Sequence, residues 1–185
     1  MKTEEIKLAE LLCTRLCHEL AGIVGALQGS VEMLQEGDNS KENVELLSDA
    51  TTEIFNRLRL YRTVFGKEND EGLALAETRE LIEKSGRNIH FDWPDQAWPG
   101  WQDQKRGRIV SLCFLVAYSI LSQGGSIALL SDFTLDFKGK TRKLSDNSSD
   151  PRNSEWFLAQ KLAAYQNLDL SLVLEAAGGK IKLNP

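Results

Sequence analysis

The histidine at position 18 is the residue whose type and neighbours best suit covalent chemistry. It is one of two histidines in the chain, and Arg15 and Glu19 lie close to it in sequence. An imidazole with a pKa of about 6.5 is a good nucleophile near neutral pH, so its Nε2 can attack a phosphoryl group. Glu19 could orient Nδ1 or act as a general base, and Arg15 could contact the phosphoryl oxygens. These three are the candidate catalytic residues, although most exposed helical histidines have no chemical role.

The helix surface around His18 is predicted to face solvent and to carry small side chains. At about 100° per residue, His18 lies roughly opposite the apolar seam of its helix. The candidate partner-binding residues on or beside its face are Thr14, Ala21, Gly22, Gly25 and Gly29. Each glycine inside a helix costs on the order of 1 kcal/mol relative to alanine, so something must compensate. Either the glycines let a partner's backbone approach, or they allow close packing against another helix of the same bundle.

Two long helices joined by a tight turn are predicted to position His18. The first runs from Thr3 to Glu36 and the second from Lys41 to Phe65, because apolar residues recur at alternating three- and four-residue steps. Gly37 ends the first helix, and the polar residues 38–40 supply turn and capping chemistry. The predicted seam of the hairpin comprises Ile6, Ala9, Cys13, Leu16, Leu20, Ile23, Leu27, Ser30, Leu34, Val44, Leu47, Thr51, Ile54, Leu58, Tyr61 and Phe65.

A single hairpin with this surface cannot bury its own apolar stripe. Leu8, Leu12, Val24 and Val31 widen the stripe of the first helix beyond a two-helix seam. A second copy of the hairpin would cover it, giving a four-helix bundle across a homodimer. The alternative is that the rest of the same chain covers the hairpin.

The polar, glycine-flanked segment 66–72 is typical of a linker. It divides the chain into a helical hairpin domain, 1–66, and a mixed α and β domain, 73–185. In the second domain, helices are predicted at 77–85, 107–122, 155–166 and 169–177, strands at 88–93, 126–131, 134–137 and 180–183, and an exposed loop at 140–153. We therefore expect an α+β protein: an N-terminal helical hairpin followed by an α/β sandwich of helices packed on a sheet.

Composition narrows the possible partners and the compartment. The net charge is −5, and the chain has no strongly basic segment, so neither nucleic acid nor an anionic membrane is an expected partner. We expect Cys13, Cys17 and Cys113 to be reduced core residues of a cytoplasmic protein. A zinc site at Cys13, Cys17 and His18 is disfavoured, because adjacent residues point to different helix faces. The first ten residues do not resemble a signal peptide, and no stretch is long and apolar enough to cross a bilayer.

The segment around His18 resembles two related families. Leu16-Cys17-His18-Glu19-Leu20 is similar to the H-box of sensor histidine kinases, where His-Glu-Leu opens the dimerisation and phosphotransfer helix. Together with residues 23–26, Ile-Val-Gly-Ala, it more closely resembles the ChpT-type histidine phosphotransferases of alphaproteobacteria. Glu19 stands where that family has aspartate, and Ile23 where proline often stands, so we expect a straighter first helix. The resemblance covers the whole chain, and it implies that His18 carries the phosphoryl group. His90, the other histidine, is expected to be structural.

The second domain resembles a kinase ATPase domain that has lost its nucleotide chemistry. Residues 108–127 are similar to the N-box helix and the turn after it. Counting back from Gly124-Gly125, the two asparagines that would hold Mg²⁺ and phosphate fall at Leu112 and Val116, which cannot bind a cation. The sequence also has no Asp-x-Gly-x-Gly run, while residues 177–181 resemble the last turn and strand of that fold. A degenerate histidine-kinase ATPase-like domain without ATP-dependent activity is therefore expected.

The resemblance implies a histidine phosphotransferase that relays a phosphoryl group between receiver-domain aspartates in a two-component phosphorelay. The implied partners are response-regulator receiver domains and a hybrid histidine kinase. The chain itself is expected to bind no cofactor, because the receiver would supply its own Mg²⁺. The main alternative is a non-catalytic dimeric adaptor that binds signalling partners through the same glycine face. A divergent histidine kinase is the second alternative, against which Leu112 and Val116 argue.

Overall fold

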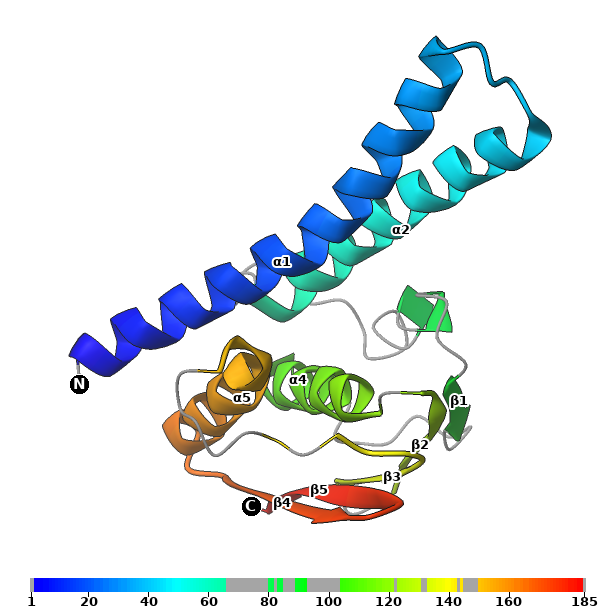
Figure 1. Ribbon diagram of the computed structural model, residues 1–185. Coiled ribbons are helices and arrows are strands. Elements are labelled where there is room, and N and C mark those ends of the chain that lie inside the picture. Colours follow the sequence, from blue (N-terminus) through cyan, green and yellow to red (C-terminus); the bar gives the residue numbers. More distant parts are fainter. Residues whose placement is uncertain are drawn as a thin grey trace.

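The fold is α+β, with two long helices at the N-terminus and a five-stranded mixed sheet after them (Figure 1). The computed structural model describes residues 2–65, 80, 81, 83, 84, 89–92, 104–121, 123–130, 133–142, 144 and 150–184. The expected fold class is confirmed, with the dimeric bundle left as a prediction. The linker predicted at 66–72 lies outside the described residues, as does most of the helix predicted at 77–85.

The two helices form as their periodicity predicts, but the predicted seam residues Ile6, Val44 and Leu58 are exposed in the single chain. Helix α1 spans Lys2–Gln35 and helix α2 spans Lys41–Phe65, and the two pack against each other, with the N-terminal turns of α1 extending beyond α2 (Figure 1). Gly37 adopts φ +96°, and the backbone amides of Gly37 and Asp38 donate to the carbonyls of Leu34 and Met33. This pattern is a Schellman motif, in which a left-handed residue satisfies the last carbonyls of a helix. Ser40 then caps α2, its Oγ accepting from the amide of Asn43 at 3.3 Å.

The sheet is built from one parallel and three antiparallel pairs of strands. Its order is β1-β2-β3-β5-β4, with β1 (Ile89–Asp92) parallel to β2 (Gly125–Leu129). Strands β3 (Thr134–Lys138), β5 (Gly178–Asn184) and β4 (Asp169–Glu175) pair antiparallel. The strands predicted at 88–93, 126–131, 134–137 and 180–183 are thus confirmed to within two residues at each end.

The helix predicted at 169–177 is wrong, because these residues form strand β4. Its sequence, Asp-Leu-Ser-Leu-Val-Leu-Glu, is rich in leucine, which favours a helix, but leucine also recurs at every second position. A two-residue turn at Ala176 and Ala177 joins β4 to β5, and every residue of β4 has a partner in β5. Gly178 and Gly179, predicted as the turn, are instead the first residues of β5. Pairing with a neighbouring strand overrides the local helix propensity.

Two helices cover one face of the sheet and carry the hairpin on their outer side (Figure 1). They are α4 (Gln104–Ile120) and α5 (Ser154–Tyr165). The apolar core between them and the sheet includes Ile109, Leu112, Phe114, Ile120, Ile127, Leu135, Phe137, Ala159 and Ile181. Leu60 and Val64 of α2 belong to the same cluster. The base of the hairpin is therefore anchored on the second domain by apolar burial.

Two smaller predictions need correction. Residues 140–153 are not an exposed loop throughout, because Asp150 is buried and caps a short 3-10 helix, η2 (Pro151–Asn153). Among the cysteines, all three are free and Cys113 is buried, but Cys13 and Cys17 are exposed in the single chain. Neither α2 nor α5 covers their side of α1, so the expectation that they are core residues is wrong for the isolated chain.

Gly179 occupies a position where a side chain has no room. An added Cβ would lie 2.6 Å from both the Phe137 ring and the Val173 carbonyl oxygen. Gly179→Ala should therefore lower the free energy of unfolding by about 1–3 kcal/mol, as overpacking does, which urea unfolding would measure. Gly107→Ala in α4 is the matched control, because a Cβ there meets no described atom within 4 Å. We expect it to stabilise the protein by up to about 1 kcal/mol, and equal effects of both variants would contradict this packing.

Candidate functional site

His18 lies near the middle of α1 with its side chain exposed, as predicted. Ala21, Gly22 and Gly25 are exposed beside it and Gly29 is half-buried. Thr14 is exposed too, but its hydroxyl donates to the carbonyl of Glu10 at 2.8 Å, a bond within the helix. The structure therefore brings the predicted partner-binding residues onto one accessible stretch of α1.

The glycines beside His18 are not required for packing within the single chain. A Cβ built on Gly22, Gly25 or Gly29 meets no described atom within 4 Å. Close packing against another helix of the same bundle was the other explanation for these glycines, and within the single chain the described residues do not support it. The face of α1 that carries His18 is therefore open in the single chain, both to a signalling partner and to the second hairpin of the predicted bundle.

The side chains of Glu19 and Arg15 are held by contacts with each other and with distant parts of the chain. One carboxylate oxygen of Glu19, Oε1, forms an ion pair with Arg15. The other, Oε2, accepts the hydroxyl of Tyr61 and lies 3.4 Å from Nη1 of Arg57, both in α2. The Arg15 and Glu19 side chains are each 21% exposed. The structure thus brings Arg15 and Glu19 together, facing α2 and the second domain, while their direct roles at His18 stay predictions.

A buried carboxylate of the second domain completes this charged cluster. Nε of Arg15 donates to Oε1 of Glu155 at 3.2 Å, and Glu155 is only 7% exposed. Burial raises the pKa of Glu155, and the positive charge of Arg15 opposes that rise. Burial also raises the pKa of the Tyr61 phenol, and the Glu19 carboxylate adds to the effect. Arg15, Glu19, Arg57, Tyr61 and Glu155, which we call the hairpin cluster, join α1, α2 and α5.

Sequence reasoning missed three members of the hairpin cluster. Tyr61 was counted as an apolar seam residue, which hid the role of its hydroxyl. Arg57 could have been found, because it shares a seven-residue spacing with Asn43, Ala50 and Val64, all of which are buried. A charge on such a stripe needs a partner, and Arg57 also lies over the Tyr118 ring at 5.8 Å. Glu155 gave no signal, because it begins a helix and only the fold shows that it is buried.

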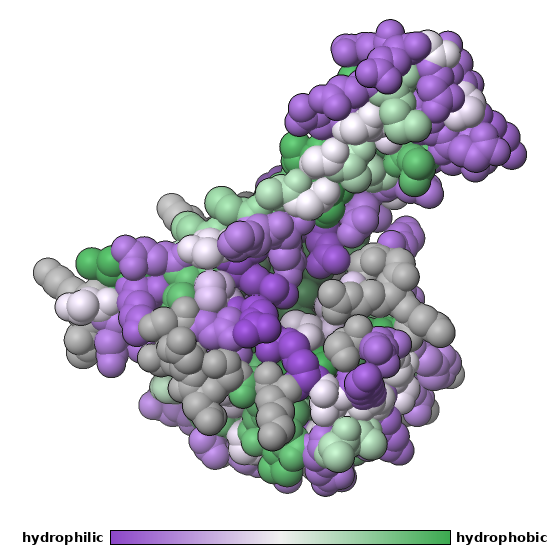
Figure 2. All heavy atoms as spheres, in the orientation of Figure 1, coloured by the Kyte–Doolittle hydropathy of each residue, from purple (hydrophilic) through white to green (hydrophobic). Residues whose placement is uncertain are grey.

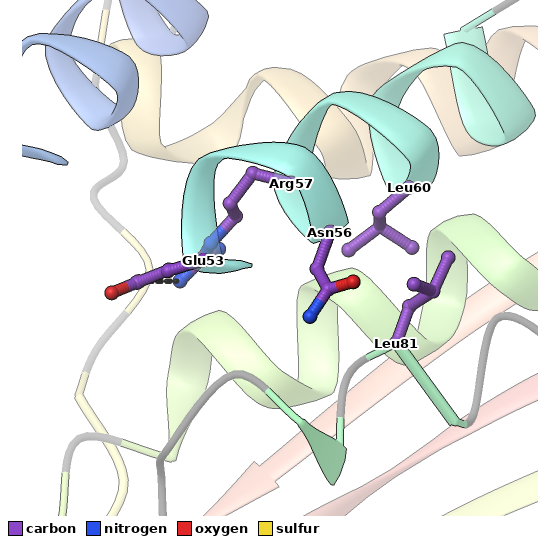
Figure 3. A pocket seen from close by; sticks show the side chains of 5 residues that line it. All are labelled: Glu53, Asn56, Arg57, Leu60 and Leu81. Atoms are coloured by element: carbon purple, nitrogen blue, oxygen red, sulfur yellow. Dashed lines mark ion pairs between the residues drawn. The ribbon is translucent and has the colours of Figure 1, made fainter. Parts of the chain in front are cut away.

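A small recess beside the hairpin cluster carries no binding role. It is lined by Glu53, Asn56, Arg57, Leu60 and Leu81, and Figure 3 shows the ion pair between Glu53 and Arg57 at its rim. Leu60 and Leu81 close its other side (Figure 3). The space is too small to enclose a ligand, so we interpret it as imperfect packing between α2 and the residues around Leu81.

The two residues that stand where a kinase has its metal-binding asparagines are packed in the hydrophobic core. Leu112 is fully buried and Val116 is 2% exposed, and both belong to the apolar cluster of α4. Within the described part of the chain, no three His, Cys, Asp or Glu side chains gather as metal ligands would. None of the described helices is long and apolar enough to cross a membrane.

Comparison with known proteins supports the resemblance seen around His18. No protein-family model matches the chain. The protein phosphotransferase ChpT of Brucella abortus (strain 2308) is 23% identical over 193 aligned residues, covering 97% of this chain and 90% of that protein. The resemblance to a ChpT-type phosphotransferase is confirmed.

One solved structure shares the fold of this chain. The structure of a bacterial phosphotransferase superposes with a TM-score of 0.74 at 16% identity, covering 97% of this chain and 96% of that one. At 16% identity, this match shows that the two chains share a fold. The Acinetobacter baumannii histidine kinase AdeS gives a TM-score of 0.48 at 9% identity, covering 90% of this chain and 95% of that one, which is too low to support an argument.

The open face of α1 predicts that a side chain added there does not disturb the fold. Gly25→Leu should leave the free energy of unfolding unchanged or raise it by up to about 1 kcal/mol, through the difference in helix propensity. Chemical denaturation monitored by circular dichroism would measure it. A loss of about 1–3 kcal/mol would instead indicate overpacking and revive the internal-packing explanation for the glycines.

Proposed function

We propose that this chain is a histidine phosphotransferase of a two-component phosphorelay and that His18 carries the phosphoryl group. The observation that carries the proposal is an exposed histidine on an open, glycine-lined helix face. The similarity to ChpT over 97% of the chain supports the same function. A lone exposed histidine would not suffice, but here it lies where a partner's backbone can approach without meeting side chains.

In the proposed reaction, Nε2 of His18 attacks the phosphorus of an aspartyl phosphate on a donor receiver domain. A P–N bond forms, the P–O bond breaks, and the donor aspartate leaves as a carboxylate. The reverse steps then move the phosphoryl group from His18 to the aspartate of a second receiver domain. Mg²⁺ held by the receiver would offset charge on the phosphoryl oxygens, so this chain needs no metal of its own. Most of the catalysis is then positioning of the two reacting groups.

The proposed partners follow from this chemistry. They are response-regulator receiver domains, one of them part of a hybrid histidine kinase, and the expected site of action is the cytoplasm. The rival adaptor function would use the same open face without phosphoryl transfer. Intrinsic kinase activity is disfavoured, because Leu112 and Val116 supply packing where a kinase needs polar ligands.

The proposal is tested by following phosphate onto His18. Receiver domains phosphorylated with acetyl phosphate are incubated with this chain, and acid-labile phosphate is measured. We expect wild-type protein to accept phosphate and His18→Gln to accept none, while its free energy of unfolding changes by less than about 0.5 kcal/mol. His90→Gln is the control and should still accept phosphate. Undiminished transfer to His18→Gln would refute the assignment.

We also propose that the hairpins of two chains form a four-helix bundle. Heptad-spaced apolar side chains of both helices remain exposed in the single chain, among them Ile6, Val24 and Val31 of α1 and Val44 and Leu58 of α2. Figure 2 shows white and green residues running along the hairpin. Ile6, Val44 and Leu58 were predicted in the α1–α2 seam but lie beside it, and a second hairpin would bury them together with Val24 and Val31.

The dimer is tested at a residue that is exposed within the chain. Leu58 is 50% exposed, so Leu58→Asp should not unfold the monomer but should place an unpaired charge inside the proposed bundle. We expect light scattering to show a dimer for the wild-type protein and a monomer for the variant at micromolar concentration. Tyr165→Asp, at an 81% exposed position outside the hairpin, is the control and should stay dimeric. A monomeric wild-type protein would contradict the bundle.

A further inference from the structure

Glu155 is a buried carboxylate that takes no part in the proposed transfer. It is the second residue of α5, and its neighbour Ser154 is fully buried. The hydroxyl of Ser154 donates to Oε2 of Glu155 at 3.3 Å, and Nε of Arg15 donates to Oε1 at 3.2 Å. Acidic side chains are rarely buried unless they are paired. The pairing with Arg15 ties the second domain to the helix that carries His18.

Arg15 joins two carboxylates and therefore links three helices. Its Nε contacts Glu155 of α5, and its Nη2 pairs with Glu19 of α1. The other oxygen of Glu19 accepts the Tyr61 hydroxyl of α2 and lies 3.4 Å from Arg57. One continuous series of contacts thus runs from α5 through α1 to α2. Its two members in α1, Arg15 and Glu19, stand on either side of His18 in the sequence.

Burial keeps Arg15 in this arrangement. If its guanidinium turned toward a phosphoryl group on His18, the buried Glu155 would lose its nearest cation. Removing one partner of a buried ion pair is strongly unfavourable, because the other charge is left uncompensated. Arg15 is therefore better suited to hold the helix than to follow the phosphoryl group.

We propose that Glu155 is a positioning residue for transfer at His18, because through Arg15 it fixes the turn of α1 that carries His18 against the second domain. The inference deepens the proposed function and rests on it for the transfer readout. In this proposal the second domain has a role that needs no nucleotide, because it holds the acceptor histidine in a fixed orientation. A receiver docking on that face would then meet an imidazole already in place.

The electrostatics of Glu155 fit a role other than stability. Burial raises its pKa, so the ionised form is less favourable in the folded protein than in the unfolded chain. The stabilising contribution of such a group is present at low pH and is lost as pH rises through its folded pKa. Above that pKa a neutral side chain at 155 should therefore fold at least as stably. The described charges that act on Glu155 are Arg15 and Glu19 from α1 and Arg142 from the segment after β3.

The test compares two ion pairs that join the same helices. Glu155→Gln removes the charge that holds Arg15 but keeps the size of the side chain. Lys161→Gln is the matched control, because Lys161 of α5 pairs with Glu4 of α1 at 3.7 Å on the exposed surface. Hydrogen exchange is measured for the backbone amides of residues 15–22. We expect exchange about tenfold faster in Glu155→Gln and unchanged within about twofold in Lys161→Gln. Equal exchange in the wild-type protein and Glu155→Gln would overturn the proposal.

A second variant, Arg15→Lys, tests whether the effect comes from the lost ion pair and not from the glutamine side chain itself. Arg15→Lys keeps the positive charge, but a single ammonium cannot bridge two carboxylates as the guanidinium fork does. It should speed exchange in the same turn, and wild-type exchange in this variant would count against the bridge. Glu155→Gln should melt at or above the wild-type temperature at pH 8. A large drop in its melting temperature would show that Glu155 serves general stability, which would also overturn the proposal.

The pH dependence of transfer separates positioning from structure. Rates of phosphate uptake from acetyl-phosphate-charged receiver domains are measured for the wild-type protein and Glu155→Gln across the pKa of Glu155. Any pH effect that the two proteins share cancels in the ratio of their rates. We expect a ratio of about ten above the pKa of Glu155, falling to one below it as the wild-type carboxyl becomes neutral. A ratio that does not change with pH would overturn the proposal. If no receiver transfers, the phosphorelay function fails, while hydrogen exchange still decides the role of Glu155.

Discussion

The pairing of Arg15 with the buried Glu155 is the interaction that, in our proposal, orients the two domains. Apolar contacts of Leu60 and Val64 hold the base of the hairpin on the sandwich, but such contacts are not directional. The guanidinium fixes direction, since its fork must meet Glu155 and Glu19 at once. With α1 held at this angle, one side faces α2 and α5, and the opposite side, with His18, is left to solvent.

The open side of α1 and the packed core of the second domain affect stability in opposite directions. In α1, glycines weaken the helix by their propensity yet leave space that no described atom of the chain fills. In α4, Leu112 and Val116 strengthen the core where a kinase would need polar ligands. Under the proposed function, stability is given up where a partner would approach and gained where a kinase would bind nucleotide. The protein is thereby suited to receive and hand on a phosphoryl group.

The sequence was sufficient to predict features that depend on local pattern. The three-four spacing placed α1 and α2 within one or two residues, and the adjacent residues of the H-box singled out His18. Features that depend on distant partners could not be predicted in the same way. Strand β4 has leucine-rich, helix-favouring sequence and becomes a strand only because β5 lies beside it. Glu155 begins a helix like many exposed glutamates, and its burial against Arg15 requires the tertiary fold.

The contact between Arg15 and Glu155 also has a consequence for the order in which the molecule assembles, because its partners are 140 residues apart in the chain. The hairpin has short-range contacts and can form as soon as Phe65 has left the ribosome. The sandwich must wait for β5, whose pairing with β3 closes the middle of the sheet. For most of synthesis the hairpin therefore exists without the domain that orients it. Fast local folding comes first, and a slow, long-range closure completes the protein.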